Sequence, residues 1–392
     1  MPDTPRRGTP QDRALRGLLA DCRRLVSVRG DSGDPRLAQA IVQQIDTLAD
    51  DTRRRFFEHL ARDFGPDPQQ VLACAQAFAE APEQPERLIQ LTQAAEPPRQ
   101  ELFRRLNRAP GGTAAIVRLR RSLLERLPRH PQLQAVEHDL HHLLSSWFNP
   151  GFLQLRKVDW NSPAQLLEQI IHHEAVHAID GWDDLRRRLQ PDRRCFAFFH
   201  PQLPDEPLIF VEVALVPEMA AAIAPLIDKK SQPLPAESFS VAVFYSISNC
   251  QPGLRGVSLG NFLIKRVAEL LKQELPQLKT FCTLSPIPGF TDWLQRQPGG
   301  ADRSAAELLR MAAHFLVYES VKPHGDPVAR FHLDNGARLE RLNPHANLSA
   351  KGLKQSAGLM VNYLYDLARI ETCHDRFVQG RVVHSRAVAA LL

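Results

Sequence analysis

The chain has 392 residues, of which 43% are hydrophobic and 24% are charged, and its formal net charge is +5. This length and apolar content are enough for two domains with separate cores. The small charge is spread along the chain, which argues against a long nucleic-acid track and suits a compact polyanionic ligand better. The six cysteines are scattered without a C-x-x-C pair, so we expect reduced thiols and no disulfide framework.

The first ten residues combine charges and prolines without an apolar run, so we expect no secretory signal. Glu212, Pro217 and Glu218 interrupt the longest apolar stretches, which stay shorter than the roughly 20 residues that a membrane span requires. We therefore expect a cytoplasmic location and no membrane partner.

Within the expected N-terminal domain, residues 1–148, the sequence has the apolar periodicity of helices from Gln11 to about Leu144. Leu37, Ile41, Ile45 and Leu48 recur at spacings of three and four, and glycine or proline pairs interrupt the pattern at intervals. The segment predicts a bundle of several helices. Since it combines no nucleophile, base and anion site, we expect a scaffold or oligomerisation domain.

Asn149-Pro-Gly151 marks the expected junction with a second domain, residues 149–392. Ser162-Pro163 predicts a helix start, with the serine as cap and the proline in the first helical position. Apolar runs typical of strands then follow at residues 195–199, 208–216 and 239–247.

The segment His173-Glu-Ala-Val-His177 matches the H-E-x-x-H pattern of zinc proteases on a predicted helix. Asp180 and Asp183 stand where the extended metzincin form has its glycine and its third histidine. A zinc protease is therefore an alternative hypothesis. The plain structural interpretation is a polar helix near the domain junction.

A strand, a loop with several glycines, an amphipathic helix and a second strand, Thr280–Leu284, follow one another between Val241 and Phe290, and a Ser-Pro turn comes after the second strand. The loop is Asn249–Gly260, and the helix extends to about Glu274. A helix start presents unpaired N–H groups and a positive dipole end, which together bind phosphate. The glycines fit neither G-x-G-x-x-G nor G-x-x-x-x-G-K. Within the helix we expect one buried face, formed by Leu263, Ile264, Val267, Leu270 and Leu271.

The run Arg255-Gly-Val-Ser-Leu-Gly260 resembles the pyrophosphate loop of the Gcn5-related N-acetyltransferase superfamily. Further runs, from about Ser146 to about Tyr365, resemble the malonyl-CoA decarboxylase family. These runs are Glu206–Leu215, Phe244–Ser248, Gly260–Val267, Leu284–Trp293, Pro327–Gly336 and Ser356–Tyr363.

This resemblance implies an all-helical N-terminal bundle followed by an acetyltransferase-like, mixed α/β catalytic domain. It implies conversion of malonyl-CoA and a proton to acetyl-CoA and CO2 through a thioester enolate. No metal or organic cofactor is then required, because coenzyme A is part of the substrate and product. The family also suggests a homodimer or homotetramer and no nucleic-acid partner.

The resemblance assigns Ser285 and His332 to catalysis. His332 is the expected proton donor, since imidazole titrates near neutrality. Ser285 would position or polarise the malonyl group, or bond to His332 and fix its ring. Tyr365 is a candidate pocket residue. Backbone of the loop would hold the diphosphate, at Arg255, Gly256, Val257, Ser258, Leu259, Gly260 and Asn261. Ser258 stands where the family commonly has glutamate, which puts a catalytic role for that position in doubt.

Without the resemblance, Ser285 is the hydroxyl of a turn before Pro286, and His332 is a strand histidine bonded to backbone. Amine acetylation with acetyl-CoA and non-catalytic sensing of acyl-CoA are the other functional alternatives. Residue spacing does not decide between malonyl and methylmalonyl groups.

Overall fold

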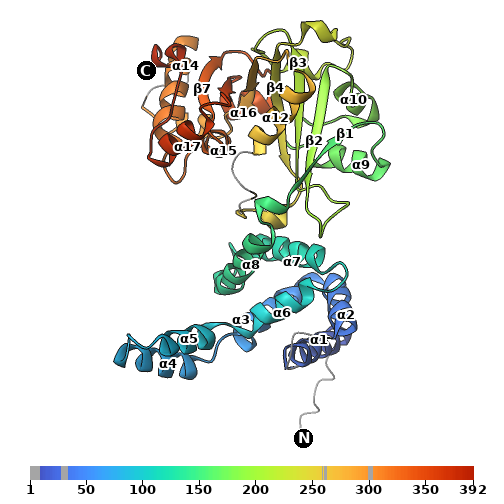
Figure 1. The fold of residues 1–392 in the computed structure, drawn as a ribbon, viewed down its shortest axis with the longest axis vertical. Coiled ribbons are helices and arrows are strands. Elements are labelled where there is room, and N and C mark those ends of the chain that lie inside the picture. The colour runs from blue at the N-terminus through green and yellow to red at the C-terminus, as the bar shows by residue number, and fades with distance from the viewer. Residues whose placement is uncertain (1–8, 28–33, 258, 260–262, 299–302) are drawn as a thin grey trace, which may run out of the picture. The chain divides into compact units, whose positions relative to one another are not determined.

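The computed structural model describes residues 9–27, 34–257, 259, 263–298 and 303–392. They form two compact units (Figure 1). One comprises Met1–Phe152 with two short returning segments, His200–Pro204 and Gln251–Leu259, and the other contains the remaining residues. The expected fold class, a helical bundle followed by a mixed α/β domain, is confirmed.

The helical unit is held together by apolar faces repeated every three to four residues, such as Leu37, Ile41 and Ile45. Asp34 and Asp67 cap two of its helices through their carboxylates, and proline follows each cap. Its described helices are α1 Pro10–Ser27, α2 Pro35–Asp46, α3 Asp50–Asp63, α4 Pro68–Glu80, α5 Pro85–Ala95, α6 Pro98–Asn107, α7 Gly112–Arg126 and α8 Gln134–Trp147.

A buried arginine fastens the returning segment Gln251–Leu259 to α7 and α8. Arg120 donates to the backbone oxygens of Gly253 (2.7 Å) and Arg255 (2.8 Å), and it pairs with both carboxylate oxygens of Glu137. Its guanidinium therefore links the loop to the helices through hydrogen bonds, and the Glu137 carboxylate compensates its charge inside the unit.

The second unit contains one eight-stranded sheet in the described residues, with the strand order β1-β2-β3-β4-β5-β8-β6 and β7 also paired to β8. Its strands are β1 Gln154–Val158, β2 Arg193–Phe199, β3 Ile209–Val216, β4 Val241–Asn249, β5 Thr280–Thr283, β6 Ser285–Pro286, β7 Arg338–Asn343 and β8 Met360–Leu364. The β4–β5 pair is parallel, and the other described pairs are antiparallel. A parallel pair needs a crossover, which α12 Leu263–Glu274 supplies.

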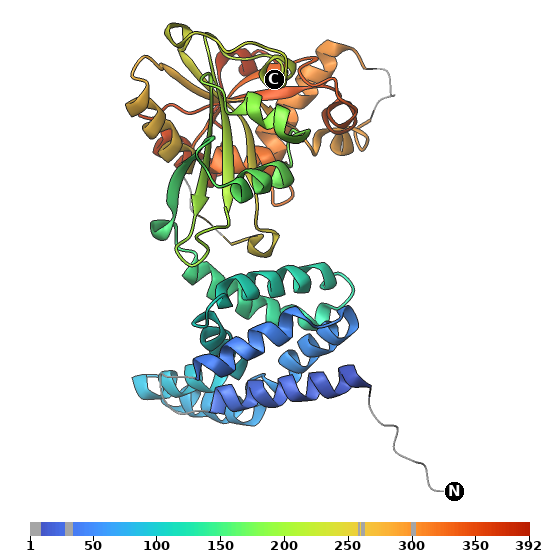
Figure 2. The same ribbon diagram turned by 90° about the vertical axis from the view of Figure 1, so that its right-hand side faces the viewer.

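Helices cover both faces of this sheet. The helices α9 Ala164–His173 and α10 Gly181–Arg188 pack on the side chains of Cys195, Ala197 and Phe199 in β2, and Figure 2 shows these two green helices in front of the strands. The intervening residues of β2 face α12, since Arg266 lies over the Phe198 ring at 5.5 Å.

On α12, Leu263, Ile264, Val267 and Leu271 are buried as expected. The expectation for Leu270 is wrong, because its side chain is 38% exposed and Ala268 is buried instead.

The remaining helices of this unit lie in the segments that follow β3, β6, β7 and β8. They are α11 Ala224–Ile227, α13 Phe290–Leu294, α14 Ala305–His314, α15 Pro327–Asp334, α16 Ala350–Ser356, α17 Ile370–Val378 and α18 Arg386–Ala389. None of the helices in the described ranges combines the length and apolar content that crossing a bilayer requires.

The expected cap at Ser162 is wrong. The helix α9 begins at Ala164 with Pro163 as its cap residue, and the Ser162 hydroxyl instead accepts the N–H of Asp159 (3.1 Å). The serine therefore closes the turn before the helix.

We expect Glu137→Ala to lower the free energy of unfolding of the helical unit by about 3 kcal/mol or more, because it leaves the buried Arg120 charge uncompensated. Urea titration followed by circular dichroism measures the change. Glu125→Ala, which removes an exposed partner of Arg121, serves as the control and should cost less than about 0.5 kcal/mol. Equal effects of the two substitutions would contradict a structural role for the buried pair.

Candidate active site

The candidate site lies where two neighbouring strands part. Parallel pairing of β4 with β5 ends at Phe244 and Thr283, while β4 continues to Asn249. Beyond Thr283 the chain turns toward β8, where Ser285 pairs with Val361. The pairing of β4 with β3 also shifts at this point and leaves Tyr245 as an extra residue, a β-bulge that bends the strand.

A cavity of about 250 Å³ opens between the parted strands. Most of its lining is apolar, and the polar groups come from the strand ends and from α15. The lining residues are Val176, Ile209, Phe244, Tyr245, Ile247, Asn249, Ser285, Pro286, Pro327, Val328, Phe331 and His332. The architecture is that of a small-molecule site with a few convergent polar groups.

Ser285 is 5% exposed and makes two hydrogen-bond contacts through Oγ. Its hydroxyl donates to Oγ1 of Thr283 (2.8 Å), and its oxygen lies 2.9 Å from Nε2 of His332. The two predicted catalytic residues, 47 positions apart in the sequence, are therefore in direct contact.

His332 lies in the last turn of α15, so the strand position considered for it from the sequence is wrong. The helix is short and begins at Pro327, after Asp326, whose carboxylate accepts the N–H groups of Val328 and Ala329. The other carboxylate oxygen of Asp326 accepts the N–H of Gly289 (2.9 Å). This cap fixes the start of the helix that carries the imidazole.

Two tyrosines surround the imidazole: Tyr363 in β8 and Tyr365 directly after that strand. Nδ1 of His332 lies 2.8 Å from the hydroxyl oxygen of Tyr365, and the Tyr363 ring stacks on the imidazole with centroids 4.7 Å apart. The structure thus brings Tyr365 to the Ser285–His332 pair, although Tyr365 itself is absent from the cavity lining.

Burial lowers the pKa of His332 from 6.5 to about 3, because desolvation disfavours the imidazolium. Burial also raises the pKa of Tyr363 and of Tyr365 well above the usual value for a phenol. The expectation that His332 titrates near neutrality is therefore wrong. At pH 7 the ring is neutral, and one of its nitrogens carries hydrogen while the other accepts.

The predicted diphosphate loop is described only in part, since Ser258, Gly260 and Asn261 lie outside the described residues. Arg255, Gly256, Val257 and Leu259 belong to the helical unit. Gly256 has φ of +82°, which glycine adopts without strain, and its carbonyl oxygen lies 3.0 Å from Nε2 of His141.

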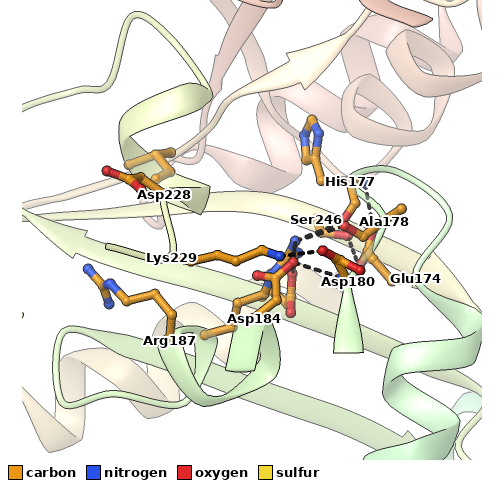
Figure 3. A network of polar contacts seen from close by, with 12 residues as sticks. Glu174, His177, Ala178, Asp180, Asp184, Arg187, Asp228, Lys229 and Ser246 are labelled. Carbon is orange, nitrogen blue, oxygen red and sulfur yellow. Dashed lines mark hydrogen bonds and ion pairs between the residues drawn. The ribbon is translucent and has the colours of Figure 1, made fainter. Parts of the chain in front are cut away.

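The H-E-x-x-H segment does not form the predicted helix, because α9 ends at His173. The Glu174 carboxylate accepts the N–H groups of Val176 and His177 (2.8 Å each) and the hydroxyl of Ser246 (2.6 Å). Figure 3 shows the His177 ring pointing away from the Glu174 carboxylate.

Burial and the charges of Arg188 and Lys351 lower the pKa of His177 to about 3. Within the described ranges, no three His, Cys, Asp or Glu side chains gather in a group fitted to hold a metal ion.

Three residues of the site were not predicted from the sequence. Thr283 contacts Ser285, Tyr363 stacks on His332, and Asp326 caps the helix that carries His332. An Asp-Pro pair is a typical helix start, so a signal for Asp326 was present in the sequence. Thr283 ends β5 and Ser285 lies in β6, so strand alternation did not predict their contact. Tyr363 carried no comparable local signal.

Two family models match the chain. The malonyl-CoA decarboxylase C-terminal domain matches residues 151–305 and 297–392, and the malonyl-CoA decarboxylase N-terminal domain matches residues 64–148. The mitochondrial malonyl-CoA decarboxylase of Anser anser anser is 37% identical over 368 residues, covering 79% of this chain and 73% of that protein. That of Mus musculus is 36% identical over 376 residues, covering 80% and 76%.

Solved structures agree with these matches. The malonyl-CoA decarboxylase of Rhodopseudomonas palustris has a TM-score of 0.89 and 46% identity, covering 96% of this chain and 99% of its own. The Agrobacterium vitis malonyl-CoA decarboxylase has a TM-score of 0.88 and 45% identity, with the same coverage.

The depressed pKa of His332 predicts a specific acid sensitivity. Below pH 6.5 the unfolded chain binds a proton at this residue, whereas the folded chain stays neutral until about pH 3. The contribution of neutral His332 is fully present above pH 6.5, and stability falls by about 1.4 kcal/mol per pH unit as the pH drops toward 3. We expect His332→Asn to flatten the slope of unfolding free energy against pH by this amount between pH 6 and 5.

Urea titrations of both proteins at the two pH values measure that difference. His177 is unchanged in both proteins and adds the same slope to each, so it cancels. Identical slopes, or a His332 ring resonance that titrates near pH 6.5, would overturn the assignment of a neutral imidazole.

Proposed function

This chain belongs to the malonyl-CoA decarboxylase family, and we propose that it converts malonyl-CoA and a proton to acetyl-CoA and CO2 through a thioester enolate at the Ser285–His332 pair. The observation that carries the proposal is the 2.9 Å contact between Ser285 Oγ and His332 Nε2, with both residues lining one cavity. The scheme needs no metal or organic cofactor beyond the coenzyme A of the substrate.

The cavity favours loss of CO2 through its polarity. Among the described residues that line it, no side chain is lysine or arginine, and His332 is neutral at pH 7. A malonyl carboxylate that enters this cavity gives up water without gaining a cation, so the localised charge is destabilised. Breaking the bond between the α-carbon and the carboxylate moves the electron pair onto the thioester and spreads the charge.

Ser285 supplies the polar contact to the malonyl group in this scheme. In the structure this hydroxyl donates to Thr283; when substrate binds, we expect its hydrogen to turn to the thioester oxygen while the Ser285 oxygen still accepts from Nε2 of His332. The new hydrogen bond stabilises the enolate as charge develops there. The contact matters more in the transition state than in the bound substrate, so its loss reduces kcat more than affinity.

His332 returns the proton to the α-carbon. A C–H bond forms at the expense of the Nε2–H bond, and Nδ1 takes the phenolic proton of Tyr365, which lies 2.8 Å away. The imidazole therefore stays neutral throughout, in agreement with its burial. The phenolate of Tyr365 regains a proton from water, which accounts for the single proton that the overall reaction consumes.

The backbone from Arg255 to Asn261 is the proposed diphosphate cradle. The described part of this loop is held firmly, since Arg120 bonds the oxygens of Gly253 and Arg255. The N–H groups of Arg255 and Val257 already donate to the backbone oxygens of Pro252 and Leu254, so within the described loop we propose Gly256, rather than these two, as a donor to the anion. The homodimer or homotetramer suggested by the resemblance stays a prediction.

We expect Ser285→Ala and His332→Asn each to lower kcat about 100-fold or more, the range for an oxyanion donor or an acid–base group, with smaller changes in KM. Release of CO2 and acetyl-CoA from malonyl-CoA alone, without any acceptor, measures turnover. Near-normal kcat in both variants would refute the assigned roles.

The same assay separates the alternatives. Consumption of acetyl-CoA that depends on an added amine would instead indicate acetyl transfer. Tight binding of malonyl-CoA without turnover would indicate an acyl-CoA sensor.

The proposed role of the loop in binding the diphosphate predicts an effect on KM that is separate from the effects on kcat above. A Cβ added at Gly253 would lie 2.0 Å from the Val117 backbone oxygen, so Gly253→Ala must displace the loop. We expect KM for malonyl-CoA to rise about tenfold, the cost of roughly one lost hydrogen bond, while kcat at saturation changes little. Gly17→Ala, where nothing lies within 4 Å of the added carbon, is the matched control. An unchanged KM in Gly253→Ala would contradict the proposed cradle.

A further inference from the structure

We propose that Thr283 is a positioning residue that determines which nitrogen of His332 carries the hydrogen. The inference rests on the proposed function, because it explains how a neutral imidazole presents a proton on the side of Ser285. Thr283 is fully buried at the end of β5 and has no place in the cavity lining. It acts only through Ser285.

The direction of one hydrogen bond sets the direction of the others. The Ser285 hydroxyl donates to Oγ1 of Thr283, at 2.8 Å. A serine hydroxyl has a single hydrogen, so toward His332 the Ser285 oxygen is an acceptor. The 2.9 Å contact is then a hydrogen bond only if Nε2 of His332 carries the hydrogen.

A hydrogen bond on the opposite side of the imidazole continues this series. With hydrogen on Nε2, the Nδ1 nitrogen of neutral His332 has a free lone pair and accepts from the Tyr365 hydroxyl at 2.8 Å. Hydrogen bonds therefore run in one direction, from Tyr365 through His332 and Ser285 to Thr283. Reversal would require Thr283 to become the donor to Ser285.

Thr283 is held so that its oxygen keeps accepting. The N–H of Tyr363 donates to Oγ1 (3.2 Å), and the side-chain amide of Asn362 donates to the Thr283 backbone oxygen (2.7 Å). Together with the Ser285 hydroxyl, the Tyr363 N–H occupies both lone pairs of the threonine oxygen. Thr283 ends β5 and Ser285 begins β6 after one intervening residue, and the 2.8 Å hydrogen bond shows that the connection between them brings their hydroxyls together.

We expect removal of the threonine hydroxyl to reverse the direction of these hydrogen bonds. Without that acceptor, the Ser285 hydroxyl turns to Nε2 of His332, and the ring hydrogen moves to Nδ1, where the Tyr365 oxygen accepts it. The enolate then faces an imidazole nitrogen that has no proton to give. The defect concerns the tautomer and proton delivery rather than substrate binding.

The test compares Thr283→Val, which keeps the shape of the side chain, with Thr283→Ser, which keeps the hydroxyl. We expect Thr283→Val to lower kcat about 10-fold or more with little change in KM, and Thr283→Ser to restore most of kcat. Nitrogen NMR of ¹⁵N-histidine protein reads the tautomer directly, and the signals missing in His332→Asn identify the residue. Hydrogen on Nε2 is expected in the native chain and in Thr283→Ser, and hydrogen on Nδ1 in Thr283→Val.

Ser356→Ala controls for loss of a buried hydroxyl. Ser356 is 1% exposed, and its hydroxyl oxygen lies 2.7 Å from the backbone oxygen of Leu359 and 3.1 Å from that of Gly352, away from the cavity lining. We expect this variant to have a lower Tm with unchanged kcat and an unchanged His332 tautomer. If Thr283→Val lowers Tm alone, its role is structural and the proposal is wrong.

The outcomes also separate this inference from the proposed function. Full activity in Thr283→Val, or hydrogen on Nδ1 in the native chain, overturns the inference while loss of turnover in Ser285→Ala and His332→Asn still supports the reaction scheme. Full turnover in the latter two variants overturns both.

Discussion

The parting of β4 from β5 is the constraint on which the site depends. Parallel pairing of the two strands ends at Phe244 and Thr283, after which β4 continues to Asn249 and the segment after β5 stays paired with β8 through Ser285. The bulge at Tyr245 lets β4 bend without losing its pairing with β3. An opening in the middle of a sheet has apolar walls and a few polar strand ends, which is the environment that a reaction through a desolvated carboxylate needs.

Burial determines the chemistry of the imidazole in that opening. No described charged group holds a proton on His332, and desolvation alone depresses its pKa. The ring is therefore useful as a neutral relay between two hydroxyls rather than as a cation. A cationic imidazole would attract the malonyl carboxylate and stabilise the ground state, which would oppose the release of CO2.

Much of the fold could be predicted from the sequence, because local patterns specify its helices and strands. The strands and the crossover helix follow from apolar periodicity, as the close agreement of β2 to β5 with the expected ranges illustrates. The resemblance supplied Ser285 and His332, but neither pattern nor resemblance gave the protonation of the imidazole, since burial is a tertiary property. The H-E-x-x-H segment failed as a helix because Glu174 bonds to the N–H groups that follow it and to Ser246 in β4. The spacing of residues does not show that a side chain will take backbone N–H groups that a helix would otherwise use.

The helical unit is built from three separate segments of the sequence, which limits where the polypeptide can be cut without loss of contacts. The polypeptide leaves the helical unit at Phe152 and contributes to it twice more, through His200–Pro204 and Gln251–Leu259. A truncated fragment that starts at Leu153 would retain the loop sequence but lose the guanidinium of Arg120, which holds the oxygens of Gly253 and Arg255. Exchange of the N-terminal domain for another one is therefore hindered. A replacement bundle would need its own side chain to bind the oxygens of Gly253 and Arg255, which lie about 100 residues beyond the end of the bundle sequence in the chain.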